Sequence, residues 1–329
     1  MIFLKNNNTL LLLVSIIFSY IFVFIIPWTN WVYFIDIDFY MDRVAVLFAY
    51  GLAGDTTKDF TGIYFLFSEA LWYFILIQLP FLFNDVQNGL SFISFISLLV
   101  YSFYTFRHAN IFISFILLLN PIFIDLIMSQ IRIAFAFAIL LLAYMLIKKS
   151  KILSIILAVS SFFIHTVSFL LVAIYFFIFA MKKIIKDEDL LLKTMIILPF
   201  LMVFFISFLA LPILDFFGDS GRVAYFTGEA DTSTLVFSAI YLGFSILIAI
   251  LPKKKTFLEV IDIITYCIFM GSLFFSLSLV QLYGSRFVAV TFPFFIIAIG
   301  KLKSQPRFIL YSLLFIYQLI YMSYWIKFT

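Results

Sequence analysis

The sequence predicts an all-α, polytopic integral membrane protein with about 11–12 hydrophobic helical segments, one of them a candidate re-entrant segment. Hydrophobic residues make up 65% of the 329 positions and charged residues only 12%, whereas a soluble domain carries about 25% charged residues. Mean hydropathy is +1.20. So little charge cannot cover a water-facing surface. The composition therefore excludes a cytosolic enzyme, a nucleic-acid binder and a secreted disulfide scaffold.

The helical segments follow from apolar runs that succeed one another with short polar interruptions. A helix of about 20 residues crosses a bilayer core of about 30 Å. We expect a single transmembrane domain over 1–329, with main outer loops at 28–61 and 212–233. The apolar segments lie near 10–27, 62–83, 89–106, 109–127, 132–147, 152–180, 190–211, 234–251, 257–280, 286–300 and 307–326.

Two of these segments do not fit one upright crossing. The run 152–180 has 29 residues, too many for an upright helix, so we expect a strongly tilted helix or a hairpin broken near His165. Segment 62–83 breaks the count of crossings if it spans fully. We expect it to be re-entrant or interfacial, with Glu69 in a partly wet location.

Lysine-rich loops orient the chain. The segments Lys148–Lys151, Lys182–Lys186, Lys253–Lys255 and Lys301–Lys303 are short and basic, and such loops stay on the cytoplasmic side. Both ends of the run 152–180 then lie inside, which favours the hairpin.

Several function classes are excluded by what the chain lacks. The helices leave no room for a nucleotide-binding domain, and no G-x-x-x-x-G-K-[ST] phosphate loop occurs. An ATP-driven pump and a cytosolic sugar-nucleotide transferase are therefore disfavoured. One cysteine, Cys267, and two histidines leave no multi-cysteine or His-rich metal site, so we expect neither metal nor cofactor.

The arginines do not follow the lysines. In this topology Arg43, Arg132, Arg222 and Arg286 face outside, and Arg132 and Arg286 stand at outward-pointing helix N-termini. A cation there is mildly unfavourable unless an anion also binds, and the guanidinium fork matches phosphate. Snorkelling to headgroups, or pairing of Arg132 with Asp125, is the alternative. For Arg43 and Arg222, ion pairing with the outer acidic residues stays open.

His165 and several outer aromatic residues are further candidates. An ionisable residue in a membrane run is functional by default, although His165 could also be a hydrogen-bonded packing residue. Trp28 and Trp31 suit an aromatic belt at the membrane boundary, and together with Tyr40 they are also candidates for a surface on which sugars stack.

Four stretches follow one another in the middle of the sequence, Asn120-Pro121, Gln130–Ala136, Lys148–Lys151 and Phe162–Phe169. Together they resemble the EpsG-like branch of Wzy-type polysaccharide polymerases. The outer patch Asp36–Tyr40 and the late motif Tyr283–Arg286 also fit. The sequence departs from the pattern at Ile133, where the family often has Gln.

The resemblance implies an enzyme that joins undecaprenyl-diphosphate-linked oligosaccharide repeat units. It implies a multi-pass protein of the bacterial inner (cytoplasmic) membrane whose active site faces the periplasm or outside. The product would be O-antigen, capsule or exopolysaccharide. A lipid-linked donor agrees with the missing nucleotide-sugar domain.

The resemblance also suggests roles for individual residues. Arg132 and Arg286 would hold the diphosphate and stabilise its developing charge. His165 would hydrogen-bond the diphosphate or act as the base that activates the acceptor hydroxyl, and Asp38 competes for the base role. Substrate-binding residues are expected to be Arg222, Arg43, Tyr40 and Tyr283. Expected partners are the lipid-linked oligosaccharide and membrane lipids, with a chain-length regulator as a candidate and no nucleic acid.

Three other functions compete with this interpretation. An O-antigen ligase shares the donor and the membrane face, but its usual mark is one large late outer loop, and 212–233 is modest. A lipid-linked oligosaccharide flippase or transporter would favour broken helices in paired repeats, and no repeat is visible. A membrane O-acyltransferase would also use an intramembrane histidine.

Overall fold

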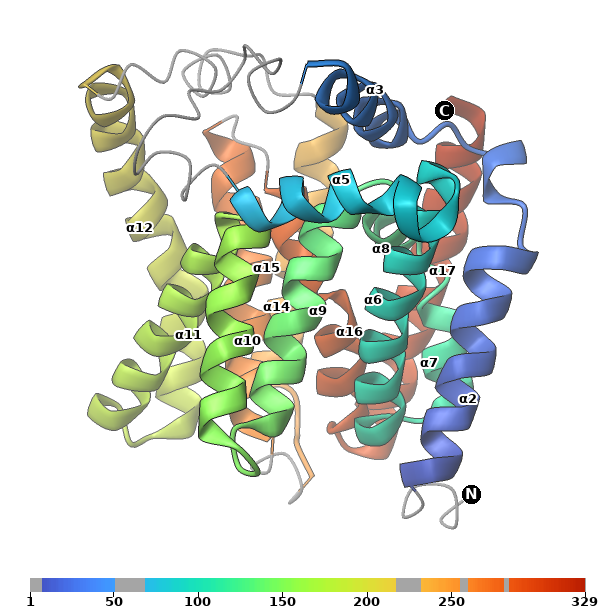
Figure 1. The fold of residues 1–329 in the computed structure, drawn as a ribbon. Coiled ribbons are helices and arrows are strands. Elements are labelled where there is room, and N and C mark those ends of the chain that lie inside the picture. Colours follow the sequence, from blue (N-terminus) through green and yellow to red (C-terminus); the bar gives the residue numbers. More distant parts are fainter. Residues whose placement is uncertain (1–7, 51–68, 217–231, 255–259, 281–283, 329) are drawn as a thin grey trace. The chain divides into compact units, whose positions relative to one another are not determined.

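The structure, a computed structural model, describes residues 8–50, 69–216, 232–254, 260–280 and 284–328 (Figure 1). These residues are mostly helical, and the isolated bridge between Lys253 and Leu302 is their one β-type pairing. Five helices in the described part are long and apolar enough to cross a membrane, or six if a bent pair counts as one span. The prediction of an all-α polytopic membrane protein is confirmed.

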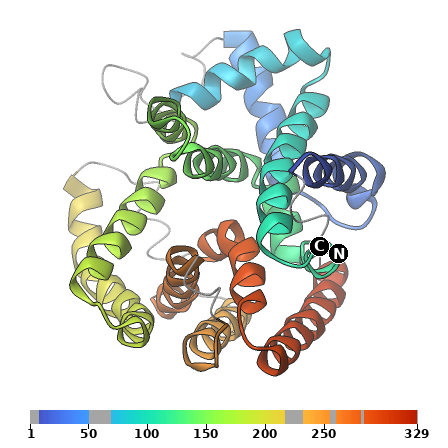
Figure 2. The same cartoon turned by 90° about the horizontal axis from the view of Figure 1, so that it is seen from below.

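The chain forms two compact units, Met1–Ala173 with Tyr317–Thr329, and Ile174–Ile316. The helices of the first unit are α2 (Asn8–Tyr20), the π-helical turn η1 (Ile21–Ile25), η2 (Trp28–Asn30), α3 (Ile35–Tyr50), α5 (Ala70–Phe83), α6 (Val86–His108), α7 (Ile111–Leu117), α8 (Pro121–Met128), α9 (Ile131–Leu146), α10 (Lys151–Ile164), the start of α11 (Val167–Ile184) and the end of α17 (Ser304–Phe328). Helix α2 packs along α6 (Figure 2).

Helices α9 and α10 form an antiparallel pair joined by a lysine-rich turn (Figure 1). The Ser150 hydroxyl caps α10 by accepting a hydrogen bond from the backbone N–H of Leu153 at 3.3 Å. The 16 residues of α9 extend over about 24 Å. Arg132 therefore lies at one end of the pair and Lys148 at the other, and α10 brings the chain back to the end where Arg132 lies.

The long apolar run 152–180 is broken, as the hairpin alternative predicts. Helix α10 ends at Ile164 and α11 begins at Val167. His165 between them is extended, with φ −151° and ψ 120°, and its N–H still bonds the carbonyl of Ser161 at 3.0 Å.

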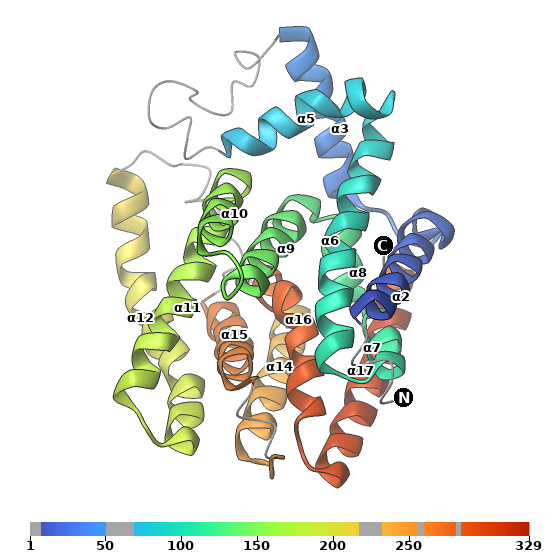
Figure 3. The ribbon, with the colours of Figure 1, turned by 60° about the horizontal axis from the view of Figure 1, so that its bottom comes forward.

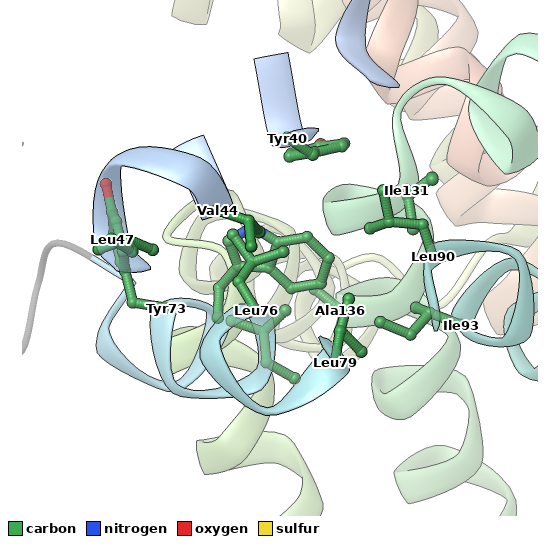
Figure 4. Close-up of a cluster of buried hydrophobic side chains, with 12 residues drawn as sticks. Tyr40, Val44, Leu47, Tyr73, Leu76, Leu79, Leu90, Ile93, Ile131 and Ala136 are labelled. Atoms are coloured by element: carbon green, nitrogen blue, oxygen red, sulfur yellow. The ribbon is translucent and has the colours of Figure 1, made fainter. Parts of the chain in front are cut away.

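Helix α5 lies across the end of the α9–α10 pair rather than along it (Figures 1 and 3). This arrangement agrees with the interfacial alternative for segment 62–83, of which residues 69–83 are described. Its inner side packs on a buried cluster shared with α3, α6, α9 and α10 (Figure 4). The cluster contains Tyr40, Val44, Leu47, Trp72, Tyr73, Leu76, Leu79, Leu90, Ile93, Ile131, Ala136 and Ile164.

The segment expected as one crossing at 109–127 is two helices. Helices α7 and α8 meet at an angle of 76°. Pro121 has no N–H to continue the first helix, and the Asn120 side chain caps the second by accepting from the N–H of Ile122 at 3.1 Å. The single crossing predicted at 109–127 is therefore wrong, although the Asn-Pro pair is a recognisable helix start.

The second unit holds most of α11, α12 (Glu188–Phe216), α14 (Thr232–Ile250), α15 (Ile261–Leu279), α16 (Ser285–Gly300) and the first part of α17. Within it α15 packs against α12, α14 and α16 (Figure 3).

Basic segments of the second unit lie side by side. The antiparallel bridge joins Lys253 to Leu302, and the N–H of Lys254 bonds the carbonyl of Lys301 at 2.9 Å. Lys253 also pairs with Asp189 at 3.0 Å, and this hydrogen bond lowers the pKa of the Asp189 carboxyl. Loops expected on one side of the membrane must lie at the same end of the helices that they connect. The loops that contain Lys253 and Lys301 meet this condition.

Candidate functional site

A buried carboxylate joins two residues that are far apart in the sequence. Oε1 of Glu69 lies 2.6 Å from Nδ1 of His165, and Oε2 accepts a hydrogen bond from Nη1 of Arg132. The three residues belong to the first unit and stand at the starts or ends of α5, α9 and α10. We call them the Glu69 cluster.

Arg132 reaches the cluster because it is the second residue of α9. Its neighbour Ile131 is buried and packs into the apolar cluster beneath α5, which fixes the rotation of the helix. The sequence left open a pair between Arg132 and Asp125. In the structure the Asp125 carboxylate accepts from the side chain of Gln130 at 2.6 Å, and Arg132 pairs with Glu69.

The break between α10 and α11 places His165. Its N–H ends α10 on the carbonyl of Ser161, and its own carbonyl accepts from the N–H of Ser168 at 2.9 Å, in the first turn of α11. The imidazole is therefore attached to a backbone that is hydrogen-bonded on both sides.

Glu69 directly precedes α5 and has a backbone conformation that is unusual for its residue type. Its φ of 69° and ψ of 41° lie in the left-handed region, which costs an L-residue about 1–2 kcal/mol. Its carbonyl accepts from the N–H groups of Trp72 and Tyr73. Strain of this kind is often retained where it serves a site.

The three side chains differ in how far they reach the surface. The exposed fractions are 6% for the Glu69 side chain, 8% for His165 and 21% for Arg132. A ligand that approaches the cluster would therefore meet the guanidinium before the carboxylate. Removing one partner of such a buried pair typically lowers the free energy of unfolding by about 3–5 kcal/mol, because it leaves an uncompensated buried charge.

The electrostatics of the α9 N-terminus explain why an anion lies there. The first N–H groups of a helix carry partial positive charge, and Arg132 adds a full one. The charge pattern of the sequence predicts a substrate anion at this position. In the structure, the chain itself places the Glu69 carboxylate there. The Nε atom of Arg132 is buried and has no acceptor among the described residues, so the guanidinium keeps donor capacity.

Three other predicted site residues lie on α3. The exposed Asp38 accepts a hydrogen bond from the Tyr33 hydroxyl, which raises the pKa of Tyr33. The ring centroid of Tyr40 is 5.5 Å from that of Trp72. The guanidinium carbon of Arg43 lies 5.5 Å from the centroid of the Tyr73 ring.

Tyr40 and Arg43 therefore contact the first turn of α5, directly after Glu69. Through that turn, both residues are neighbours of the Glu69 cluster.

The remaining predicted residues are not brought into the Glu69 cluster by the described contacts. Arg286 is exposed in the first turn of α16, in the second unit. Arg222 and Tyr283 lie outside the described residues.

The sequence predicts a partly wet location for Glu69 and assigns it no role, whereas the structure buries this residue. The signal was a single acid in the apolar run 62–83. Its partners are 63 and 96 residues away, and no local pattern links them. Within the described ranges no three His, Cys, Asp or Glu side chains gather as metal ligands.

Comparison with protein-family models, with curated proteins and with solved structures found no match to this chain.

Proposed function

We propose that this protein is a Wzy-type polysaccharide polymerase of the bacterial inner membrane. It would join oligosaccharide repeat units linked to undecaprenyl diphosphate, on the outer face of that membrane. The observation that carries the proposal is the meeting of Arg132 and His165 at one buried carboxylate. The family resemblance independently selected both residues.

The position of the cluster supports an outer site. Arg132 and His165 lie at the end of the α9–α10 pair opposite the lysine turn, and lysine-rich turns stay on the cytoplasmic side. Helix α5 crosses the same end. A substrate whose lipid tail is in the bilayer and whose sugars are in water would present its diphosphate at this level.

The chemistry of the cluster suits glycosyl transfer from a lipid diphosphate. The attacking hydroxyl loses a proton, and the diphosphate leaves with the electron pair of the broken C–O bond. Arg132 is a fork of donors for the leaving oxygens. His165 is a proton acceptor of the kind used in general base catalysis.

The test is a gel of surface glycan from cells with and without the gene. Loss of the gene should collapse a ladder of chain lengths to a single capped repeat, because units are still flipped and attached but not joined. Loss of even the single repeat would place the step earlier or at attachment, and would favour a flippase or a ligase.

Variants of Arg132 connect this phenotype to the cluster. Arg132→Ala should abolish the ladder. Arg132→Lys keeps a positive charge beside Glu69 but loses the fork, and should restore little of it. Arg107 is an exposed residue in the last turn of α6, so Arg107→Lys is the matched control and should restore the full ladder. A normal ladder from Arg132→Ala would refute the proposed role of Arg132 in polymerisation.

A further inference from the structure

Glu69 contacts Arg132 and His165 through different oxygens. Oε2 accepts from Arg132 and Oε1 faces Nδ1 of His165. One carboxylate thereby fixes the orientation of both side chains. Glu69 is also the most buried of the three, which places it beneath the two groups that a substrate would touch.

The carboxylate has a specific consequence for the imidazole. A carboxylate accepts hydrogen bonds and does not donate when ionised, so it favours the histidine form that carries a proton on Nδ1. In the neutral ring the lone pair that accepts a proton is then on Nε2. The same logic orients the histidine of hydrolytic triads.

We propose that Glu69 is a positioning residue that assigns separate roles to Arg132 and His165. Glu69 directs the guanidinium of Arg132 to the diphosphate and holds His165 with Nδ1 protonated, so that Nε2 takes the proton of the acceptor hydroxyl. This inference rests on the proposed function, and it decides between the two roles that the sequence left open for His165.

The step balances as follows. The acceptor oxygen forms a bond to the anomeric carbon, and the bond from that carbon to the diphosphate oxygen breaks. The electron pair leaves with undecaprenyl diphosphate, whose charge Arg132 faces. The hydroxyl proton moves to Nε2 of His165 and is released to water after the product leaves.

The fold supplies reasons to regard Glu69 as built for this task. Its backbone is held in the left-handed region, and its carboxylate is buried at the start of a helix that packs on α3, α6 and α10. A residue that only capped α5 would not need a buried charge, and its side chain makes no cap hydrogen bond to that helix.

The activity test compares two isosteric changes, one directly before α5 and one between α5 and α6. Glu69→Gln should reduce polymer yield by about 100-fold, the loss expected when a catalytic group is misplaced by about 1 Å. Asp85→Asn is the matched control. Asp85 is exposed and caps α6 through the N–H of Gln87, and Asn caps equally well, so yield should stay at the wild-type level.

A spectroscopic test reads the proposed contact without relying on activity. The chain has two histidines, His108 and His165, so protein labelled with ¹⁵N-histidine in lipid nanodiscs gives two assignable pairs of ring signals. Glu69→Gln should shift the nitrogen signals of His165 and leave those of His108 unchanged. His108→Gln assigns the two pairs.

The outcomes separate this inference from the proposed function. Wild-type polymer yield from Glu69→Gln, or unchanged His165 signals in that variant, would overturn the role of Glu69 while leaving a polymerase in place. A wild-type protein that makes no polymer would instead refute the proposed function. If Glu69→Gln does not fold, Glu69→Asp retracts the carboxylate by one methylene, and should lower yield by about 100-fold for the same reason; an unchanged yield would overturn the inference.

Discussion

At the scale of the residue, the candidate general bases differ in their surroundings. His165 is buried against a carboxylate. Asp38 is exposed and hydrogen-bonded to the Tyr33 hydroxyl. A base that must take a proton from a bound hydroxyl works best where a second group orients it. For His165 that group is the buried Glu69 carboxylate, whereas the partner of Asp38 is an exposed tyrosine hydroxyl.

This difference predicts unequal effects of two variants that remove the proton-accepting group. His165→Gln should reduce polymer yield by about 10²- to 10⁴-fold, the usual contribution of a general base. Asp38→Asn should leave the yield within about 10-fold of wild type. Quantified surface-glycan ladders from complemented deletion strains measure both. The reverse order would move the base role to Asp38.

At the scale of the element, the position of α5 depends on its close approach to α6. A Cβ atom on Gly89 would lie 2.9 Å from Cδ2 and 3.0 Å from Cβ of Leu79. Glycine therefore allows the two helices to meet. Because Glu69 directly precedes α5, this packing also contributes to holding the carboxylate beside Arg132.

Gly89→Ala should lower the free energy of unfolding by about 1–3 kcal/mol through overpacking. Gly243→Ala is the matched control, since nothing lies within 4 Å of the added Cβ. It should stabilise α14 by up to about 1 kcal/mol, because alanine is the better helix former. Thermal unfolding of the purified proteins in detergent compares them. A neutral Gly89→Ala would show that α5 adjusts without cost.

Length and charge in the sequence predicted much of the element order. The break at His165 followed from a run too long for one crossing, and the unusual path of α5 from the count of crossings. The bend between α7 and α8 was missed because the mostly apolar residues 109–127 have the length and composition of one crossing. Helix α3 was not expected within the loop 28–61 either. Its apolar residues pack on α5, and that partner is visible only in the folded chain.

The sequence also predicted part of the site. Charge sorting singled out Arg132, and the membrane context singled out His165. The carboxylate between them was out of reach, because contacts across 63 and 96 residues leave no local pattern. Arg222 and Tyr283 stay predictions.

At the scale of the whole molecule, the orientation in the membrane fixes which face holds the site. The lysine turn between α9 and α10 is expected inside, and the Glu69 cluster lies at the other end of these helices. The single cysteine, Cys267, is buried, so a Cys267→Ala background allows single reporter cysteines.

In that background, Asn30→Cys should react with a membrane-impermeant maleimide added to intact spheroplasts. Lys149→Cys should react only after the membrane is permeabilised. Both residues are exposed, so a difference in labelling reports the side of the membrane rather than burial. Labelling of Lys149→Cys in intact spheroplasts would invert the orientation and place the Glu69 cluster inside.

The most direct measurement is reconstitution of the reaction. Lipid-linked repeat units that accumulate in the deletion strain are supplied to the purified protein in proteoliposomes. We predict glycan of increasing length and one undecaprenyl diphosphate released for each bond formed, with neither product from Arg132→Ala. A folded wild-type protein that releases no undecaprenyl diphosphate and extends no glycan would contradict the account.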